Sequence, residues 1–195
     1  KKRTITIWRV IWLNIANKLT LARMIMIPLF IAFALVGGLW WDIAALATFI
    51  IASLTDLIDG KIARKYNMVT DFGKFMDPLA DKLLVTAALC VLVHKSEISI
   101  WFLFIITVRE FVVTGLRLVA AGSGVVIAAS MWGKVKTMLQ LIVISVSLAP
   151  IGFIHQPVLL AKSLVYWAMW AVAIITVVSG VDYVVKNKKV FAETK

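Results

Sequence analysis

The sequence predicts an all-α fold, a polytopic membrane protein with six transmembrane helices and a short N-terminal interfacial helix. Hydrophobic residues make up 62% of the 195-residue chain, charged residues make up 16%, and the mean hydropathy is +0.97. Such values are typical of membrane proteins with several spans and unusual in soluble domains. Because the sequence contains no internal repeat, low-complexity tract or separate polar region, we expect one domain over residues 1–195.

Six apolar stretches are long enough to cross a hydrocarbon core of roughly 30 Å as helices, if tilt and short ends are allowed for. In chain order they are residues 19–41, 43–59, 77–94, 98–120, 135–153 and 159–185. Residues 1–18 precede them, and Ile5, Trp8 and Trp12 recur there at helical spacing. This spacing predicts either an interfacial helix with its Trp side chains at headgroup depth or an irregular basic tail.

Basic residues are concentrated at alternate ends of these stretches. The formal net charge is +11, and Lys and Arg gather at both termini, between the second and third stretches, and near the start of the fifth. The positive-inside rule therefore predicts that both termini and the loop between the second and third spans are cytoplasmic. The positive charge suits anionic membrane lipids, and nucleic acid is not needed to explain it. The single cysteine, Cys90, lies in an apolar stretch, where we expect it to pack.

Four aspartates interrupt the apolar pattern where the second stretch ends and the third begins. Asp56 and Asp59 are three residues apart, and Asp77 and Asp81 are four apart, so each pair shares a helix face. Consecutive helices with a short connection run antiparallel, which brings the two pairs together. Converging carboxylates repel one another unless cations neutralise them, and an all-oxygen set favours Mg²⁺, Mn²⁺ or Ca²⁺ over zinc. We expect two ions about 3.5–4 Å apart, the arrangement that serves phosphoryl transfer.

Small and basic residues accompany these carboxylates. Gly60 follows Asp59 directly, and Gly73 precedes Asp77 by one helical turn. Because glycine has no side chain, a ligand can approach the backbone at both positions. Ala63 is also small, and Arg64 offers a planar donor fork for phosphate. Together they indicate a diphosphate site. Two alternatives remain open: any one aspartate could be a helix-end cap or a headgroup-exposed charge, and the set could be a divalent-cation transport site.

The first span opens with a polar stripe. Asn17, Thr20 and Arg23 follow one another at i, i+3 steps, and the stripe could simply cap and anchor the helix at the membrane edge. Pro28 follows inside the span and predicts a kink.

The aspartate pattern resembles the signature of the CDP-alcohol phosphotransferases. Its eight fixed positions are Asp56, Asp59, Gly60, Ala63, Arg64, Gly73, Asp77 and Asp81. The segments NIANKLTLARMIMIPLF, REFVVTGLRLVAAGSG and WGKVKT are similar to the bacterial phosphatidylglycerophosphate synthase branch, so the resemblance covers most of the chain. It implies a six-helix enzyme of the bacterial cell membrane, usually a homodimer, that uses Mg²⁺ or Mn²⁺ and has its active site on the cytoplasmic side.

The resemblance also implies substrates and residue roles. A phosphatidyl group would pass from CDP-diacylglycerol to sn-glycerol 3-phosphate, with release of CMP. Asp56, Asp59 and Asp77 would be metal ligands, and Asp81 a metal-associated residue and the general base. The CDP-binding residues would be Gly60, Ala63, Arg64, Gly73, Asn17 and Thr20. A related enzyme with phosphatidylglycerol, inositol phosphate or serine as acceptor remains an alternative.

Two arginines in the fourth span favour a phosphate-bearing acceptor. Arg109 and Arg117 are eight residues apart, so their directions on a helix differ by about 80°. Glu110 could neutralise part of their charge, but it follows Arg109 directly and is expected to point elsewhere, which leaves an external phosphate as partner. Lys134 and Lys136 are further candidates, of which at most one points inward because an i, i+2 pair diverges by about 160°. Arg117 and both lysines could instead be interfacial anchors.

The remaining polar residues are expected to have no part in the chemistry. His94, Glu97 and His155 fall in loops predicted to lie on the far side of the membrane. Asp182 precedes Lys186 by one turn, which predicts an ion pair at a helix end. The Trp residues are typical of an interfacial belt and core rather than of a platform for base stacking.

Overall fold

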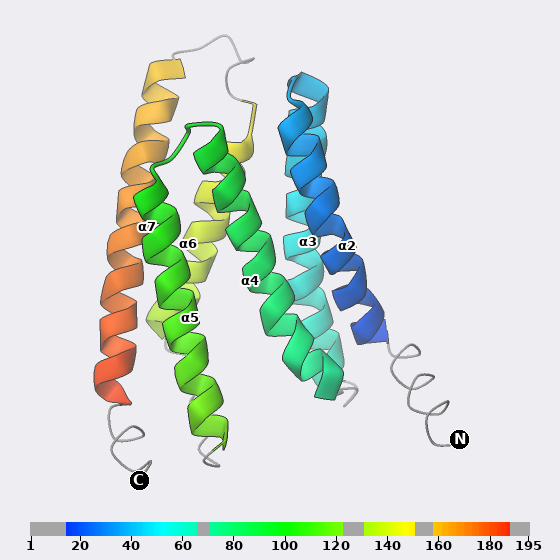
Figure 1. Ribbon diagram of the computed structural model, residues 1–195, viewed down its shortest axis with the longest axis vertical. Helices are drawn as coiled ribbons and strands as arrows, with labels where there is room; N and C mark the ends of the chain where they lie inside the picture. Colours follow the sequence, from blue (N-terminus) through cyan, green and yellow to red (C-terminus); the bar gives the residue numbers. More distant parts are fainter. Residues whose placement is uncertain (1–14, 66–70, 123–130, 151–157, 188–195) are drawn as a thin grey trace. The chain divides into compact units, whose positions relative to one another are not determined.

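The computed structural model describes residues 15–65, 71–122, 131–150 and 158–187, which form six helices and no strand (Figure 1). The helices are α2 (Ile15–Val36), α3 (Leu39–Lys65), α4 (Asp71–His94), α5 (Ile100–Gly122), α6 (Met131–Leu148) and α7 (Val158–Lys186). The prediction of an all-α fold is confirmed. The predicted interfacial helix falls on residues outside the described ranges, as does His155, and so do the side chains of 15–18, 56–65, 71–75, 77, 78, 121, 122 and 158–162.

The first helix boundary differs from the prediction. The apolar stretch was expected to continue to Trp41, but α2 ends at Val36 and α3 begins at Leu39. Gly37 and Gly38 separate them with φ angles of +73° and +96°, a backbone conformation open to glycine and unfavourable for a helix of L-residues. The chain can therefore turn sharply there although its hydropathy stays high. Asp42 lies in the first turn of α3, where a negative charge suits the helix dipole.

The helices on either side of the aspartate segment are longer than the apolar stretches. α3 continues past Asp59 to Lys65, and α4 begins at Asp71, before Asp77. Polar residues can extend both helices because, after nucleation, each added residue contributes one backbone hydrogen bond whatever its side chain. Residues 66–70 connect the two ends, and a connection of this length spans at most roughly 20 Å.

The chain divides into two compact units, residues 1–91 with 148–153 and residues 92–147 with 154–195. In the first unit, α2 packs against α3. The rings of Phe30 and Phe49 meet across this seam with centroids 5.8 Å apart. Ala34, Ala45 and Ala52 are buried, and such small residues let two helix backbones approach closely.

In the second unit, α5 packs against α7. At one end of this contact the ring of Phe102 meets those of Trp170 and Tyr166, with centroids 5.0 Å and 6.2 Å away. Further along, the interior contains polar side chains: the buried residues include Lys136 and Gln140 of α6. A helix that buries polar side chains in this way must satisfy them within the protein.

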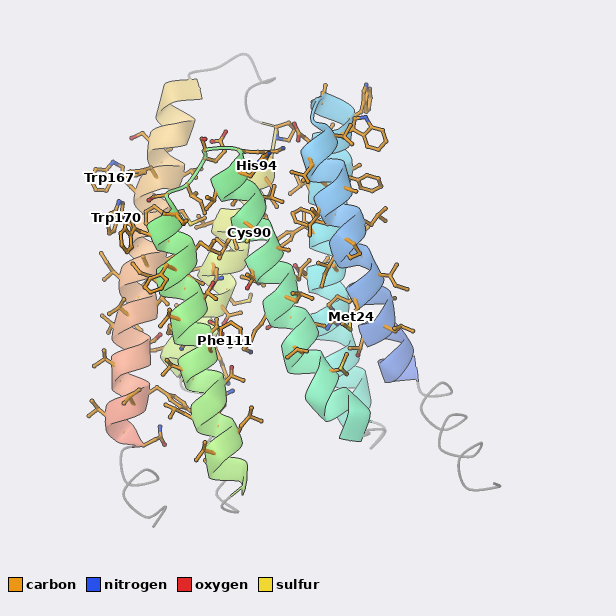
Figure 2. The ribbon with its side chains drawn as sticks, viewed as in Figure 1. Met24, Cys90, His94, Phe111, Trp167 and Trp170 are labelled. Atoms are coloured by element: carbon orange, nitrogen blue, oxygen red, sulfur yellow. The ribbon has the colours of Figure 1, made fainter. Side chains whose placement is uncertain are left out.

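Large apolar side chains lie on the outside of both units. Trp40 is 79% exposed, and Phe111 and Trp167, labelled in Figure 2, are also exposed. Cys90, also labelled, is exposed as well, so the prediction that it packs inside is wrong. Helical periodicity within a wholly apolar stretch does not say which face turns inward. Exposed apolar residues together with buried polar ones are typical of a membrane protein.

Within the described part of the chain, three helices contain segments that are long and apolar enough to cross a bilayer, by length and composition. They are Leu19–Val36, Met131–Leu148 and Ser163–Lys186, and Leu39–Thr55 is a shorter apolar segment. Pro28 lies within the first of them, and α2 continues through it as one helix. Taken with the exposed apolar surface, these segments indicate a membrane protein.

The seam between α2 and α3 generates a stability prediction. Ala52 is fully buried, so a Leu at this position would force the packed elements apart, at a cost of about 1–3 kcal/mol. Thermal unfolding in detergent should give a lower melting temperature for Ala52→Leu than for the unmodified chain. Ala47→Leu, at an exposed position of the same helix, is the matched control. Equal melting temperatures for the two variants would contradict this packing.

Candidate functional site

The helix bounds fix the register of the four aspartates. Asp56 and Asp59 both lie within α3, and Asp77 and Asp81 both lie within α4, so each pair is about one helical turn apart. All four belong to the first unit. The side chains of Asp56, Asp59 and Asp77 are outside the described part of the chain. The residues that are described contain no group of three or more potential metal ligands.

Of these four aspartates, Asp81 is the one whose side chain the structure describes. Asp81 is half-buried. It lies next to a buried helix face that is formed by Ala80 and, one turn later, Leu84. The carboxylate therefore lies at the edge of the packed interior. The backbones of Gly60, Ala63, Arg64 and Gly73 are helical, and their surroundings, like those of Asn17, lie outside the described side chains.

The polar stripe of α2 points into the first unit. Thr20 and Arg23 are both buried, with exposed fractions of 1% and 0%, and Ile27 and Phe30 continue the same buried stripe. An interfacial anchor would keep its charged group in water or among headgroups. The burial of Arg23 thus argues against the anchor interpretation for this residue, to which the sequence assigned no other role. The same unit contains the aspartates, whose charge is opposite.

Arg109, Glu110 and Lys136 form a charged cluster in the second unit. Arg109 Nη1 donates to Glu110 Oε1 at 3.2 Å, and Lys136 Nζ donates to the same oxygen. The expectation that Glu110 points away from Arg109 is wrong. The physical reason is the length of the arginine side chain, which lets its guanidinium reach round the helix to Glu110. Lys136 of α6 also donates to Glu110.

A second contact holds Arg109 from α7. Arg109 Nη2 donates to Ser179 Oγ at 3.1 Å, and the Ser179 hydroxyl donates to the Thr176 carbonyl at 3.1 Å. Gly180 leaves the room that the arginine stem needs, since a Cβ at this position would lie 3.0 Å from Arg109 Cγ. Helices α5 and α7 therefore approach closely at this level.

Arg117 is held by a different residue of α7. Its Nε donates to the hydroxyl of Tyr183 at 3.0 Å, and its guanidinium carbon lies 5.5 Å from the centre of the same ring. Tyr183 is buried whereas Arg117 is exposed, so a fixed aromatic side chain supports a guanidinium that other molecules can reach.

The two lysines of α6 face in different directions. Lys136 is 1% exposed and Lys134 is exposed, which agrees with the expectation that at most one of an i, i+2 pair points inward. Asp182 and Lys186 form the predicted ion pair, with a shortest distance of 2.8 Å.

Sequence reasoning missed Ser179 and Tyr183. A signal was present, because Thr176, Ser179 and Tyr183 recur at i, i+3, i+7 within an otherwise apolar span. All three are buried. Their contacts identify this stripe as the α7 support for the two arginines of α5.

An apolar groove with a volume of about 410 Å³ runs between α5 and α7. Its walls include Val108 and Val112 of α5 and Val177 and Val181 of α7, and Arg109 contributes the single charged side chain of the lining. Such a lining suits hydrocarbon and excludes a nucleotide.

The chain matches the family model of the CDP-alcohol phosphatidyltransferases over residues 13–182. It is 45% identical over 189 residues to the CDP-diacylglycerol–glycerol-3-phosphate 3-phosphatidyltransferase of Bacillus subtilis, a match that covers 89% of this chain and 95% of that protein. The protein with the same name from Rickettsia felis is 38% identical, with coverage of 91% and 97%. A probable phosphatidylglycerophosphate synthase of Mycobacterium tuberculosis is 40% identical, with coverage of 89% and 81%.

The family match includes every position of the aspartate pattern and both arginines of α5. On this extent of similarity, the chain belongs to the CDP-alcohol phosphatidyltransferase family.

Proposed function

We propose that this protein transfers a phosphatidyl group from CDP-diacylglycerol to sn-glycerol 3-phosphate, giving phosphatidylglycerophosphate and CMP in phospholipid biosynthesis. The observation that carries the proposal is the complete aspartate pattern on α3 and α4 in a chain that belongs to this family. The names of the similar proteins from Bacillus subtilis, Rickettsia felis and Mycobacterium tuberculosis support the choice of glycerol 3-phosphate.

The proposed setting is the bacterial cell membrane, with six spans, both termini in the cytoplasm and the active site on the cytoplasmic side. The alternation of basic ends along the sequence supports this orientation. Arg109 and Glu110 of α5 are compatible with a span because they pair with each other and Glu110 also pairs with Lys136. We also infer a homodimer, which family membership supports.

The donor set of the aspartate pattern fits a divalent cation of the Mg²⁺ or Mn²⁺ type. Asp56, Asp59, Asp77 and Asp81 offer oxygen donors alone, in pairs about one turn apart on two helices. When bound, two such cations would neutralise negative charge on the diphosphate and on the departing CMP. Without them, four carboxylates in an apolar chain would repel both one another and the substrate.

The protein's own residues bind and orient the two substrates. Gly60, Ala63 and Gly73 let the CDP group approach the backbone, with Arg64, Asn17 and Thr20 beside it as hydrogen-bond donors or acceptors. Asp81 accepts the proton of the primary hydroxyl of glycerol 3-phosphate. That oxygen attacks the phosphorus nearer the lipid, the bond from this phosphorus to the bridging oxygen breaks, and CMP leaves with the electron pair.

The acceptor phosphate is assigned to the arginines of α5. Arg117 is exposed and supported by Tyr183, and Arg109 is held by Glu110 and Ser179. Lys134 is exposed and offers a further hydrogen-bond donor. Lys136 is buried, pairs with Glu110 and adds positive charge to the cluster. Guanidinium groups suit this task because their planar fork matches the geometry of phosphate oxygens.

CMP release by the purified protein in detergent tests the proposal. The protein receives CDP-diacylglycerol and Mg²⁺ or Mn²⁺, with glycerol 3-phosphate, phosphatidylglycerol, inositol phosphate, serine or no acceptor. We expect release to depend on glycerol 3-phosphate and to fall at least about 100-fold in Asp81→Asn, the loss typical of a general base. Asp42→Asn, at the other end of α3, is the control for loss of a carboxylate.

Other results of this assay would contradict specific parts of the proposal. Dependence on a different acceptor would overturn the assignment of glycerol 3-phosphate. Substantial turnover in Asp81→Asn would exclude this residue as an essential base. Metal flux into proteoliposomes without any CMP release would favour transport over transfer.

The support of Arg117 by Tyr183 generates a kinetic prediction. Tyr183→Phe removes the hydroxyl acceptor and keeps the ring, so KM for glycerol 3-phosphate should rise about threefold. Tyr183→Leu also removes the ring beneath the guanidinium and should raise it about tenfold. Tyr166→Phe on the same helix, where the ring packs near Phe102, is the control. An unchanged KM in Tyr183→Leu would exclude a role for this contact.

A further inference from the structure

Glu110 is the central member of the charged cluster in the second unit. One of its oxygens, Oε1, accepts hydrogen bonds from Arg109 on the same helix and from Lys136 on α6. The exposed fractions of the three side chains are 22% for Glu110, 11% for Arg109 and 1% for Lys136. A single carboxylate therefore joins two helices and neutralises one of two cations.

Lys136 needs this carboxylate more than Arg109 does. An ammonium group that is almost fully buried is strongly disfavoured without a counter-ion, and Glu110 is the partner that the contacts assign to it. These three side chains comprise two cations and one anion.

The contacts around Arg109 fix its orientation from three sides. Glu110 accepts from Nη1, and Ser179 accepts from Nη2 at a distance of 3.1 Å. The bare backbone at Gly180 lies against the stem of the side chain. Within the described part of the chain, Arg109 Nε is buried near Gly180 and has no hydrogen-bond partner. The contacts therefore hold the guanidinium in one orientation.

We propose that Glu110 is a positioning residue for acceptor binding: it holds the Arg109 guanidinium in the orientation that receives the acceptor phosphate, and Lys136 holds Glu110 in turn. This inference rests on the proposed function and extends it to a residue that touches neither substrate. Lys136 acts through Glu110 as a buried counter-ion, at a distance from the phosphate.

Steady-state kinetics of Glu110→Gln test this role. At saturating CDP-diacylglycerol, KM for glycerol 3-phosphate should rise about tenfold, because a charge-assisted hydrogen bond that orients Arg109 is lost. The kcat value and KM for CDP-diacylglycerol should change less than about threefold. Glu110→Asp keeps the charge and should restore part of the affinity for glycerol 3-phosphate. Asp182→Asn, which removes the carboxylate of the pair with Lys186, is the matched control.

Folding is controlled by a second variant. Glu110→Gln removes the carboxylate that pairs with the buried Lys136. The double variant Glu110→Gln/Lys136→Met therefore removes both charges and keeps a side chain of similar length in α6. The double variant should show the same rise in KM for glycerol 3-phosphate with a melting temperature closer to that of the unmodified protein.

The outcomes separate this inference from the proposed function. CMP release by the unmodified protein with glycerol 3-phosphate, measured in the same assay, tests the function itself. An active unmodified protein with an unchanged KM in Glu110→Gln, or in the double variant, overturns the positioning role alone. A collapse of kcat with an unchanged KM would also overturn it, since Glu110 would then act in the chemical step.

Discussion

Charged groups in an apolar chain must find their partners inside the protein, and this constraint explains most of the structure. Neither lipid nor an apolar interior solvates a carboxylate or an ammonium group, so each charge has to be paired, bridged or bound to a ligand. In the second unit, Glu110 accepts hydrogen bonds from Lys136 and Arg109, and Ser179 accepts another from Arg109. In the first unit, Arg23 is fully buried on α2.

The same constraint shapes helix packing. Between α2 and α3 the seam includes small and aromatic side chains, which let the two helices approach closely. Between α5 and α7 the seam changes along its length, from aromatic rings near Phe102 to hydrogen bonds at Ser179 and Tyr183. The polar end of this seam is where the α5 arginines lie. Packing and binding thus use the same residues, which is why the supports of Arg109 and Arg117 belong to the candidate site.

Hydropathy and spacing predicted the existence of the six helices and the register of the aspartates, because both depend on local sequence. The end of α2 was missed because two glycines with positive φ, and no change in hydropathy, stop the helix at Val36. The contacts of Glu110 were missed because they depend on the reach of an arginine and on a lysine from another helix. The outward position of Cys90 was missed because an apolar stretch alone does not indicate which helix face turns inward. For Asp56, Asp59 and Asp77, the convergence of the side chains stays a prediction from the sequence.

The most direct measurement of the central claim is the electron paramagnetic resonance spectrum of the Mn²⁺-loaded protein. We propose that the aspartates of α3 and α4 share a pair of divalent cations, so the spectrum should show exchange coupling between two Mn²⁺ ions, and the coupling should disappear in Asp77→Asn. Asp182→Asn should leave the spectrum unchanged. The hyperfine pattern of an isolated Mn²⁺ ion in the unmodified protein, or coupling that survives in Asp77→Asn, would contradict a shared pair of cations at these aspartates.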